Sequence, residues 1–177
     1  MIYIIDHKDS FTHNVVHQFE NYDNVTCDNY NEINEKKLNK SKVIVFSPGP
    51  GAPKDYPISS GIYKKFKGKK KIIGICLGFQ QILHCEKGKI IEQKKIYHGY
   101  QSKIKVTSDN SLFKKNRKFN VGRYHSLKLK EPFAAKNFEI TMRCAISNVA
   151  MAIENNKENV YGFQFHPESF LTENGNL

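Results

Sequence analysis

The sequence predicts an α/β fold: a three-layer sandwich around a mostly parallel, twisted β-sheet, with extra antiparallel strands in the C-terminal half. In the first half, short apolar runs without alternation recur, as in strands buried on both faces. Helix-compatible segments separate these runs, an order typical of parallel sheets. After about residue 88 the segments become shorter strands joined by turns, which indicates a meander.

The first half is expected to contain four strands with helices between them. Asp9 or Ser10 is the expected N-cap of the first helix, whose apolar residues recur at near-helical spacing. The expected strands are residues 1–6, 24–30, 41–46 and 70–75, and the expected helices are residues 9–21 and 59–66. The expected strands of the second half are residues 88–93, 102–108, 119–127, 138–144, 149–155 and 160–167. A chain of 177 residues suits one closed core, so residues 1–177 are expected to form a single domain.

Composition narrows the classes of function. The formal charge of +11 is compatible with nucleic-acid binding, but only three of the 28 basic residues are Arg, which base and phosphate recognition favours. No apolar run approaches the roughly 18 residues of a membrane helix, and the N-terminus lacks a signal-peptide pattern. The four cysteines form no CxxC pair, and His13 and His17 are expected on a solvated helix face. We therefore expect a cytoplasmic protein that binds no metal, nucleic acid or membrane.

The stretch "GICLG", residues 74–78, has a cysteine between two glycines directly after an apolar strand. This is the cysteine counterpart of the G-x-S-x-G nucleophile elbow, in which glycines permit a sharp, strained turn into a helix. A helix N-terminus favours the thiolate of Cys76, and the amide of Leu77 would point at an oxyanion. The alternative is a buried structural cysteine with glycines that allow close packing.

Two further segments offer groups that a cysteine nucleophile requires. In "VYGFQFHPES", strand alternation sends Gln164, His166 and Glu168 to one face, which gives a base and a carboxylate that orients it. A His and a Glu two residues apart often occur by chance on a solvent-exposed strand face, so the pair alone is weak evidence. The loop "SPGPG", residues 47–51, follows a buried strand and could supply an oxyanion donor or a substrate clamp, or be a plain turn.

Six motifs in this order resemble class I, triad-type glutamine amidotransferases over nearly the whole chain. They are "DSFT", "SPGPG", "GICLGFQ", "HG", "RYHSL" and "FQFHPESFLTENG". The resemblance implies the fold of that family, which has a flavodoxin-like core. The similarity is greatest to the small subunits of anthranilate synthase and of aminodeoxychorismate synthase.

The resemblance also implies roles for individual residues. It gives a catalytic triad of Cys76, His166 and Glu168 and an oxyanion hole from the backbone N–H groups of Gly51 and Leu77. The implied glutamine contacts are Gly49, Pro50, Gly51, Gln80, Ser126 and Leu127. Phe79 departs from the family pattern, which has His there, and we interpret it as a packing or partner-facing change.

The implied function is a glutaminase subunit that converts L-glutamine to glutamate and ammonia through a cysteine thioester. The ammonia would pass to a large chorismate-binding synthase subunit, in a heterodimer or heterotetramer, for anthranilate and tryptophan biosynthesis. The alternatives are the aminodeoxychorismate branch of folate biosynthesis, a subunit shared by both branches, and a catalytically silent partner-binding protein. No cofactor is expected in this chain, and Mg²⁺ is expected only in the partner. Partner contacts are expected at residues 9–12 and 97–102.

Overall fold

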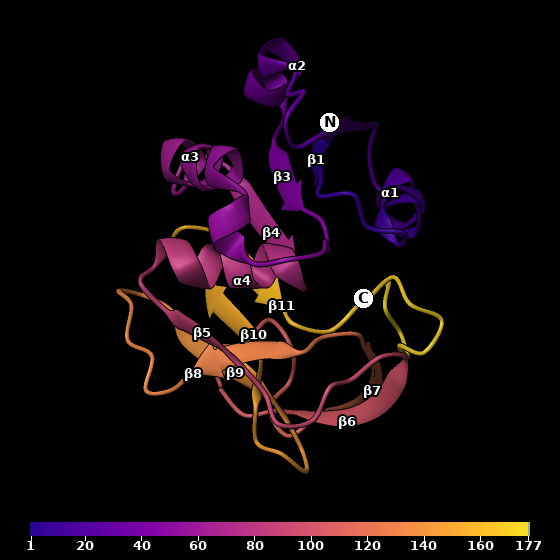
Figure 1. The fold of residues 1–177 in the computed structure, drawn as a ribbon, viewed down its shortest axis with the longest axis vertical. Helices are drawn as coiled ribbons and strands as arrows, with labels where there is room; N and C mark the ends of the chain where they lie inside the picture. Colours follow the sequence, from indigo (N-terminus) through magenta and orange to yellow (C-terminus); the bar gives the residue numbers. More distant parts are fainter. Residues whose placement is uncertain (177) are drawn as a thin grey trace.

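The computed structural model describes residues 1–176 and confirms the α/β sandwich: helices cover a nine-stranded sheet (Figure 1). The helices are α1 (Thr12–Glu20), α2 (Glu35–Lys40), α3 (Pro57–Phe66) and α4 (Leu77–Cys85), with a 3₁₀ turn, η1 (Pro53–Asp55). The strands are β1 (Ile2–Asp6), β2 (Val25–Asn29), β3 (Val43–Phe46), β4 (Lys71–Ile75), β5 (Lys89–Glu92), β6 (Tyr100–Val106), β7 (Lys118–Arg123), β8 (Leu127–Lys130), β9 (Glu139–Cys144), β10 (Ala150–Asn155) and β11 (Val160–Phe163). Among the described residues, no helix is long and apolar enough to cross a bilayer.

The main sheet has the strand order β2-β1-β3-β4-β11-β10-β9-β6-β7. The pairings from β2 to β11 are parallel, and those from β11 to β7 are antiparallel. β11, the last strand of the described residues, therefore lies beside β4, with Phe163 opposite Ile75. This pairing places the segment after β11 next to the segment after β4, although they are far apart in sequence.

Two expected boundaries were wrong. Residues 119–127 form two strands instead of one: β7 ends at Arg123, and β8 begins at Leu127 and pairs with β5 in a separate two-stranded sheet. Neither Asp9 nor Ser10 is the N-cap of α1. Phe11 occupies that position, and the Asp9 carboxylate accepts its backbone N–H at 2.8 Å in the turn before the helix.

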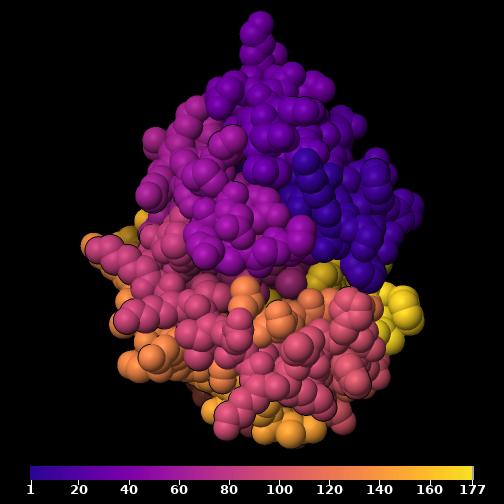
Figure 2. Space-filling view, viewed as in Figure 1, coloured from indigo at the N-terminus to yellow at the C-terminus, as the bar shows by residue number. Residues whose placement is uncertain are grey.

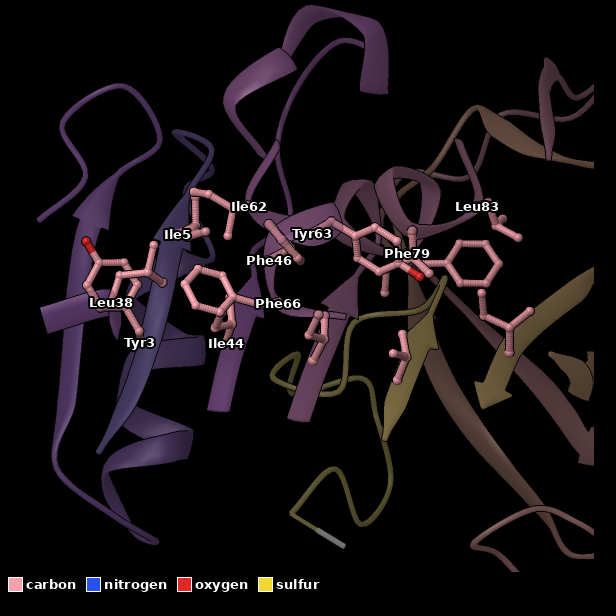
Figure 3. Packing of buried hydrophobic residues seen from close by; sticks show 14 of the residues in the cluster. Tyr3, Ile5, Leu38, Ile44, Phe46, Ile62, Tyr63, Phe66, Phe79 and Leu83 are labelled. Carbon is pink, nitrogen blue, oxygen red and sulfur yellow. The ribbon is translucent and has the colours of Figure 1, made fainter. Parts of the chain in front are cut away.

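Successive residues of a strand point to opposite faces of the sheet, and the two faces pack in separate apolar clusters. Tyr3 and Ile5 of β1 face α2, α3 and α4, together with Ile44 and Phe46 of β3 (Figure 3). The intervening Ile2 and Ile4 pack against α1 on the opposite face. Apolar residues of α1, α3 and α4 recur at helical spacing, so each helix buries one side on the sheet. Phe79 is fully buried in the first cluster, which favours the packing interpretation of this residue over the partner-facing one.

The turn from β4 into α4 brings backbone atoms into unusually close contact. A Cβ on Gly74 would lie 2.4 Å from the carbonyl oxygen of Gly78, and a Cβ on Gly78 would lie 2.2 Å from the carbonyl oxygen of Phe46. Real Cβ atoms do not approach other atoms so closely. The glycines on either side of Cys76 are therefore required for α4 to start directly against β3 and β4.

Replacing Gly78 by alanine should lower the free energy of unfolding by about 3 kcal/mol, because the added methyl group meets backbone that a strand and a helix hold in place. The matched control is Gly61→Ala in α3, where nothing lies within 4 Å of an added Cβ. This variant should be neutral or stabilised by up to about 1 kcal/mol, because Ala favours helix over Gly. Denaturant-induced unfolding measures both, and equal stabilities of the two variants would contradict the account.

Candidate active site

The candidate site lies where the two halves of the chain meet. Figure 2 shows the surface hollowed at the boundary between the indigo and purple N-terminal half and the pink and orange C-terminal half. In the same view, β4 and β11 end toward this boundary (Figure 1). The carboxyl ends of parallel strands are where α/β sheets bind ligands.

Cys76 occupies the turn between β4 and α4. Its backbone has φ +51° and ψ −98°, a conformation that L-residues rarely adopt, and its exposed fraction is 7%. The backbone N–H of Cys76 donates to the carbonyl oxygen of Phe163 at 2.8 Å, which fixes the turn to β11. The strained conformation predicted for this position is thus present.

His166 and Glu168 follow β11 and lie close together. Nδ1 of His166 donates to Oε1 of Glu168 at 2.7 Å, and the exposed fractions of the two side chains are 2% and 0%. The ring of His166 also packs edge-on against Tyr124 and Phe11, with centroid distances of 4.9 Å and 5.4 Å. The carboxylate and the two aromatic rings therefore fix the orientation of the imidazole.

The electrostatics of His166 favour its protonated form. Burial lowers the pKa of this imidazole, but the neighbouring Cys76 and Glu168 outweigh burial and raise the pKa well above its ordinary value. Among the described residues, Nε2 has no hydrogen-bond partner. This nitrogen therefore remains free for a proton transfer.

The loop of residues 47–51 packs beside the elbow, and the buried side chain of His7 contacts this loop. A Cβ on Gly49 would lie 2.7 Å from Cδ2 of Leu77, so the loop lies against the residue that follows Cys76. The backbone N–H of His7 donates to Oγ of Ser47 at 2.9 Å. Nε2 of the His7 ring lies 2.9 Å from Oγ of Ser59. Burial lowers the pKa of His7 to about 4, so the ring is neutral near pH 7. Sequence reasoning missed this role, because the contacts span 40 and 52 positions.

The segment after β7 forms another wall of the site. Nδ1 of His125 donates to the carbonyl oxygen of Leu127 at 2.8 Å, while Nε of Arg123 donates to Nε2 at 2.9 Å. Burial and the Arg123 charge lower the pKa of His125 to about 3. A neutral His125 thus shapes the turn that carries Ser126, which is exposed, and Leu127, which is half-buried.

Gln80 and Gln164 are buried beneath the elbow. Nε2 of Gln80 donates to Oε1 of Gln164 at 3.2 Å, and Nε2 of Gln164 lies 3.8 Å from Sγ of Cys76. The sequence places Gln164 on the same strand face as His166, but nothing in the pattern shows that its amide reaches the sulfur. Within residues 1–176, no three His, Cys, Asp or Glu side chains are grouped to hold a metal ion.

A cysteine on a strained strand-to-helix turn beside a buried His–Glu pair is the arrangement of enzymes that use a cysteine nucleophile. The family model "Glutamine amidotransferase class-I" matches residues 3–177, and the chain belongs to this family. It is 41% identical to "Anthranilate synthase component 2" of Lactococcus lactis subsp. lactis (strain IL1403), covering 99% of this chain and 89% of the relative. It is 37% identical to the protein of the same name from Buchnera aphidicola subsp. Schizaphis graminum, covering 99% and 91%.

Solved structures share the fold. A putative GMP synthase component from Thermoplasma acidophilum superposes with a TM-score of 0.83 at 20% identity, covering 99% of this chain and 87% of that one. A glutamine amidotransferase from Thermotoga maritima gives a TM-score of 0.71 at 17% identity, covering 94% and 75%. At these identities the likeness shows the fold alone.

His7 should make the fold less stable as the pH falls from about 7 to about 4. The pKa of His7 is 6.5 when unfolded and about 4 when folded, so the unfolded state binds more protons in this window. The free energy of unfolding therefore decreases as the pH falls, and His7 accounts for about 3 kcal/mol of this decrease. In His7→Asn, the loss of stability between these pH values should be smaller by that amount, as measured by denaturant unfolding at a series of pH values.

The matched control is His84→Asn, because His84 is exposed at the end of α4 and water contacts its ring in both states. His125 and His166 stay in all three proteins, so their contributions cancel in the comparison. Parallel curves of stability against pH for wild type and His7→Asn would contradict the assignment.

Proposed function

We propose that this chain is the glutaminase subunit of a chorismate-using synthase. It hydrolyses L-glutamine to glutamate and ammonia and passes the ammonia to a large subunit that makes anthranilate for tryptophan biosynthesis. The single observation that carries the catalytic proposal is the strained Cys76 beside the buried, hydrogen-bonded His166–Glu168 pair. Residues 1–177 act as one amidotransferase domain, which is supported by a nine-stranded sheet that contains both β1 and β11.

In the proposed reaction, the Cys76 thiolate attacks the side-chain amide carbon of glutamine. Protonated His166 gives its proton to the leaving ammonia, and a glutamyl thioester remains on the sulfur. Neutral His166 then removes a proton from water, which attacks the thioester and releases glutamate. Glu168 holds Nδ1 throughout, so that Nε2 always faces the reacting atoms. The raised pKa of His166 supports the first step, because the imidazolium is the form that donates.

The oxyanion and the substrate require further groups around the sulfur. We assign the oxyanion to the backbone N–H groups of Gly51 and Leu77. Support for Leu77 is its position as the first residue of α4, where N–H groups are not used by the helix. The remaining proposed glutamine contacts line the loop, the elbow helix and the turn after β7: Gly49, Pro50, Gly51, Gln80, Ser126 and Leu127.

The anthranilate branch is favoured by the names of the relatives, among them "Bifunctional protein TrpGD" of Thermotoga maritima, which is 36% identical over 98% of this chain and 30% of its own length. The proposed partner is therefore the large chorismate-binding subunit, to which we also assign the Mg²⁺ of the synthase reaction. The turn of residues 9–12 and the segment of residues 97–102 are the proposed partner contacts. Phe11 supports this, because it packs on the ring of His166 at the edge of the site.

Glutamine hydrolysis should require Cys76 and respond to the correct partner. The assay measures glutamate released by the chain alone, with the large component of an anthranilate synthase and with that of an aminodeoxychorismate synthase. We expect the first partner to raise the rate more than the second. Cys76→Ser should lose about a thousand-fold or more in rate, because the hydroxyl is a much weaker nucleophile than a thiolate.

Cys27→Ser in β2 is the matched control, since it removes a half-buried thiol on a strand that β1 and β3 separate from β4 and the elbow. It should retain the wild-type rate. Activity of Cys76→Ser equal to wild type would reject the mechanism, and a rate unchanged by either large subunit would reject the partner.

A further inference from the structure

The amide of Gln164 is the polar group beside the Cys76 sulfur that the triad and the oxyanion hole do not use. Its Nε2 lies 3.8 Å from Sγ of Cys76, within hydrogen-bonding range for sulfur, and its exposed fraction is 0%. We propose that Gln164 is a catalytic residue: its Nε2–H donates a hydrogen bond to the sulfur and stabilises the thiolate that attacks glutamine. The inference rests on the proposed function, since it adds a group to the same site.

The backbone fixes both ends of this contact. Cys76 donates its N–H to the carbonyl oxygen of Phe163 at 2.8 Å, and Gln164, the next residue, donates its own N–H to the carbonyl oxygen of Met151 at 2.9 Å. Strand alternation sends Phe163 to the opposite face of the sheet, so the side chain of Gln164 emerges on the face that carries α4. The pairing of β4 with β11 therefore holds the Cys76 turn and the Gln164 amide beside each other.

Gln80 orients the amide of Gln164. Its Nε2 donates to Oε1 of Gln164 at 3.2 Å, which turns the NH₂ group of Gln164 toward the sulfur. Gln80 lies one helical turn after Cys76, and its backbone N–H donates to the carbonyl oxygen of Cys76 at 3.1 Å. We therefore assign Gln80 as a positioning residue that acts through Gln164, in addition to its proposed contact with the substrate.

The burial of two glutamines at this place is unfavourable for stability alone. Apolar side chains of similar volume would fill the space without the desolvation of two amides. The hydrogen-bond chain from Gln80 through Gln164 ends at the sulfur, the atom whose charge changes in the reaction. A donor to the charged form favours that form, so the chain of amides favours the thiolate.

The neutral amide complements the charged group that faces the sulfur. His166, oriented by Glu168, contributes a positive charge only while it is protonated, and it must lose that proton when ammonia leaves. The Gln164 amide does not titrate, so its hydrogen bond is present at every stage. Gln164 can therefore hold the sulfur in position both before attack and when the sulfur leaves the thioester.

The test measures the rate at which iodoacetamide alkylates Cys76 as a function of pH, followed by mass spectrometry of the peptide that contains Cys76. Gln164→Met keeps the volume and removes the donor. We expect the midpoint of its pH profile to lie about one unit higher than in wild type, with about ten-fold slower alkylation below that midpoint. Gln80→Met should shift the midpoint in the same direction by less.

Gln81→Met is the matched control, because Gln81 is equally buried on α4 but donates to Oγ of Ser60 at 2.6 Å. Its profile should match wild type. A wild-type midpoint in Gln164→Met, or an equal shift in Gln81→Met, would overturn the proposal. If Gln164→Met does not fold, as judged by circular dichroism, Gln80→Met decides, and an unshifted profile there overturns it.

Glutamine hydrolysis measured on the same preparations separates this proposal from the proposed function. A shifted midpoint in Gln164→Met with no hydrolysis by wild type and partner retains the hydrogen bond and rejects the glutaminase. Hydrolysis by wild type with an unshifted midpoint in Gln164→Met retains the glutaminase and rejects Gln164 as a contributor.

Discussion

The close backbone approach of β3, β4 and α4 at the elbow determines the geometry of the whole site. Because Gly78 has no side chain, α4 begins directly against the carbonyl oxygen of Phe46, and Cys76 is forced to positive φ at the end of β4. The same strand pairs with β11 on its other side. His166 and Glu168 therefore reach the sulfur through the order of strands in the sheet, and no separate element is needed to deliver them.

The three buried histidines around this site differ in their electrostatic states. His7 and His125 are neutral, since burial lowers the pKa of each by more than its neighbours raise it, and both serve as fixed hydrogen-bonding groups for neighbouring loops. His166 is equally buried, but the nearby sulfur and the Glu168 carboxylate reverse the direction of its pKa shift. The distinction follows from which anions lie within reach, since the three rings have the same ordinary pKa.

Much of the fold and the centre of the site could be predicted from local sequence patterns. The buried strands β1, β3 and β4 are continuous apolar runs, and the "GICLG" turn and the alternation around His166 place the proposed reacting groups at strand ends. Features that depend on distant contacts could not be predicted. The short helix α2 has little apolar periodicity, and the break between β7 and β8 arises where buried His125 bonds to Leu127. His7 and Gln164 act through residues 40 and 88 positions away, which no local pattern contains.

The central claim is that Cys76 carries the glutamyl group during turnover. Mass spectrometry of the chain, quenched in acid during glutamine hydrolysis in the presence of the proposed large subunit, tests this claim most directly. The account predicts a glutamyl adduct on the peptide that contains Cys76, absent when glutamine is omitted. Steady release of glutamate with an unmodified Cys76 peptide, or with the adduct on another cysteine, would contradict the account.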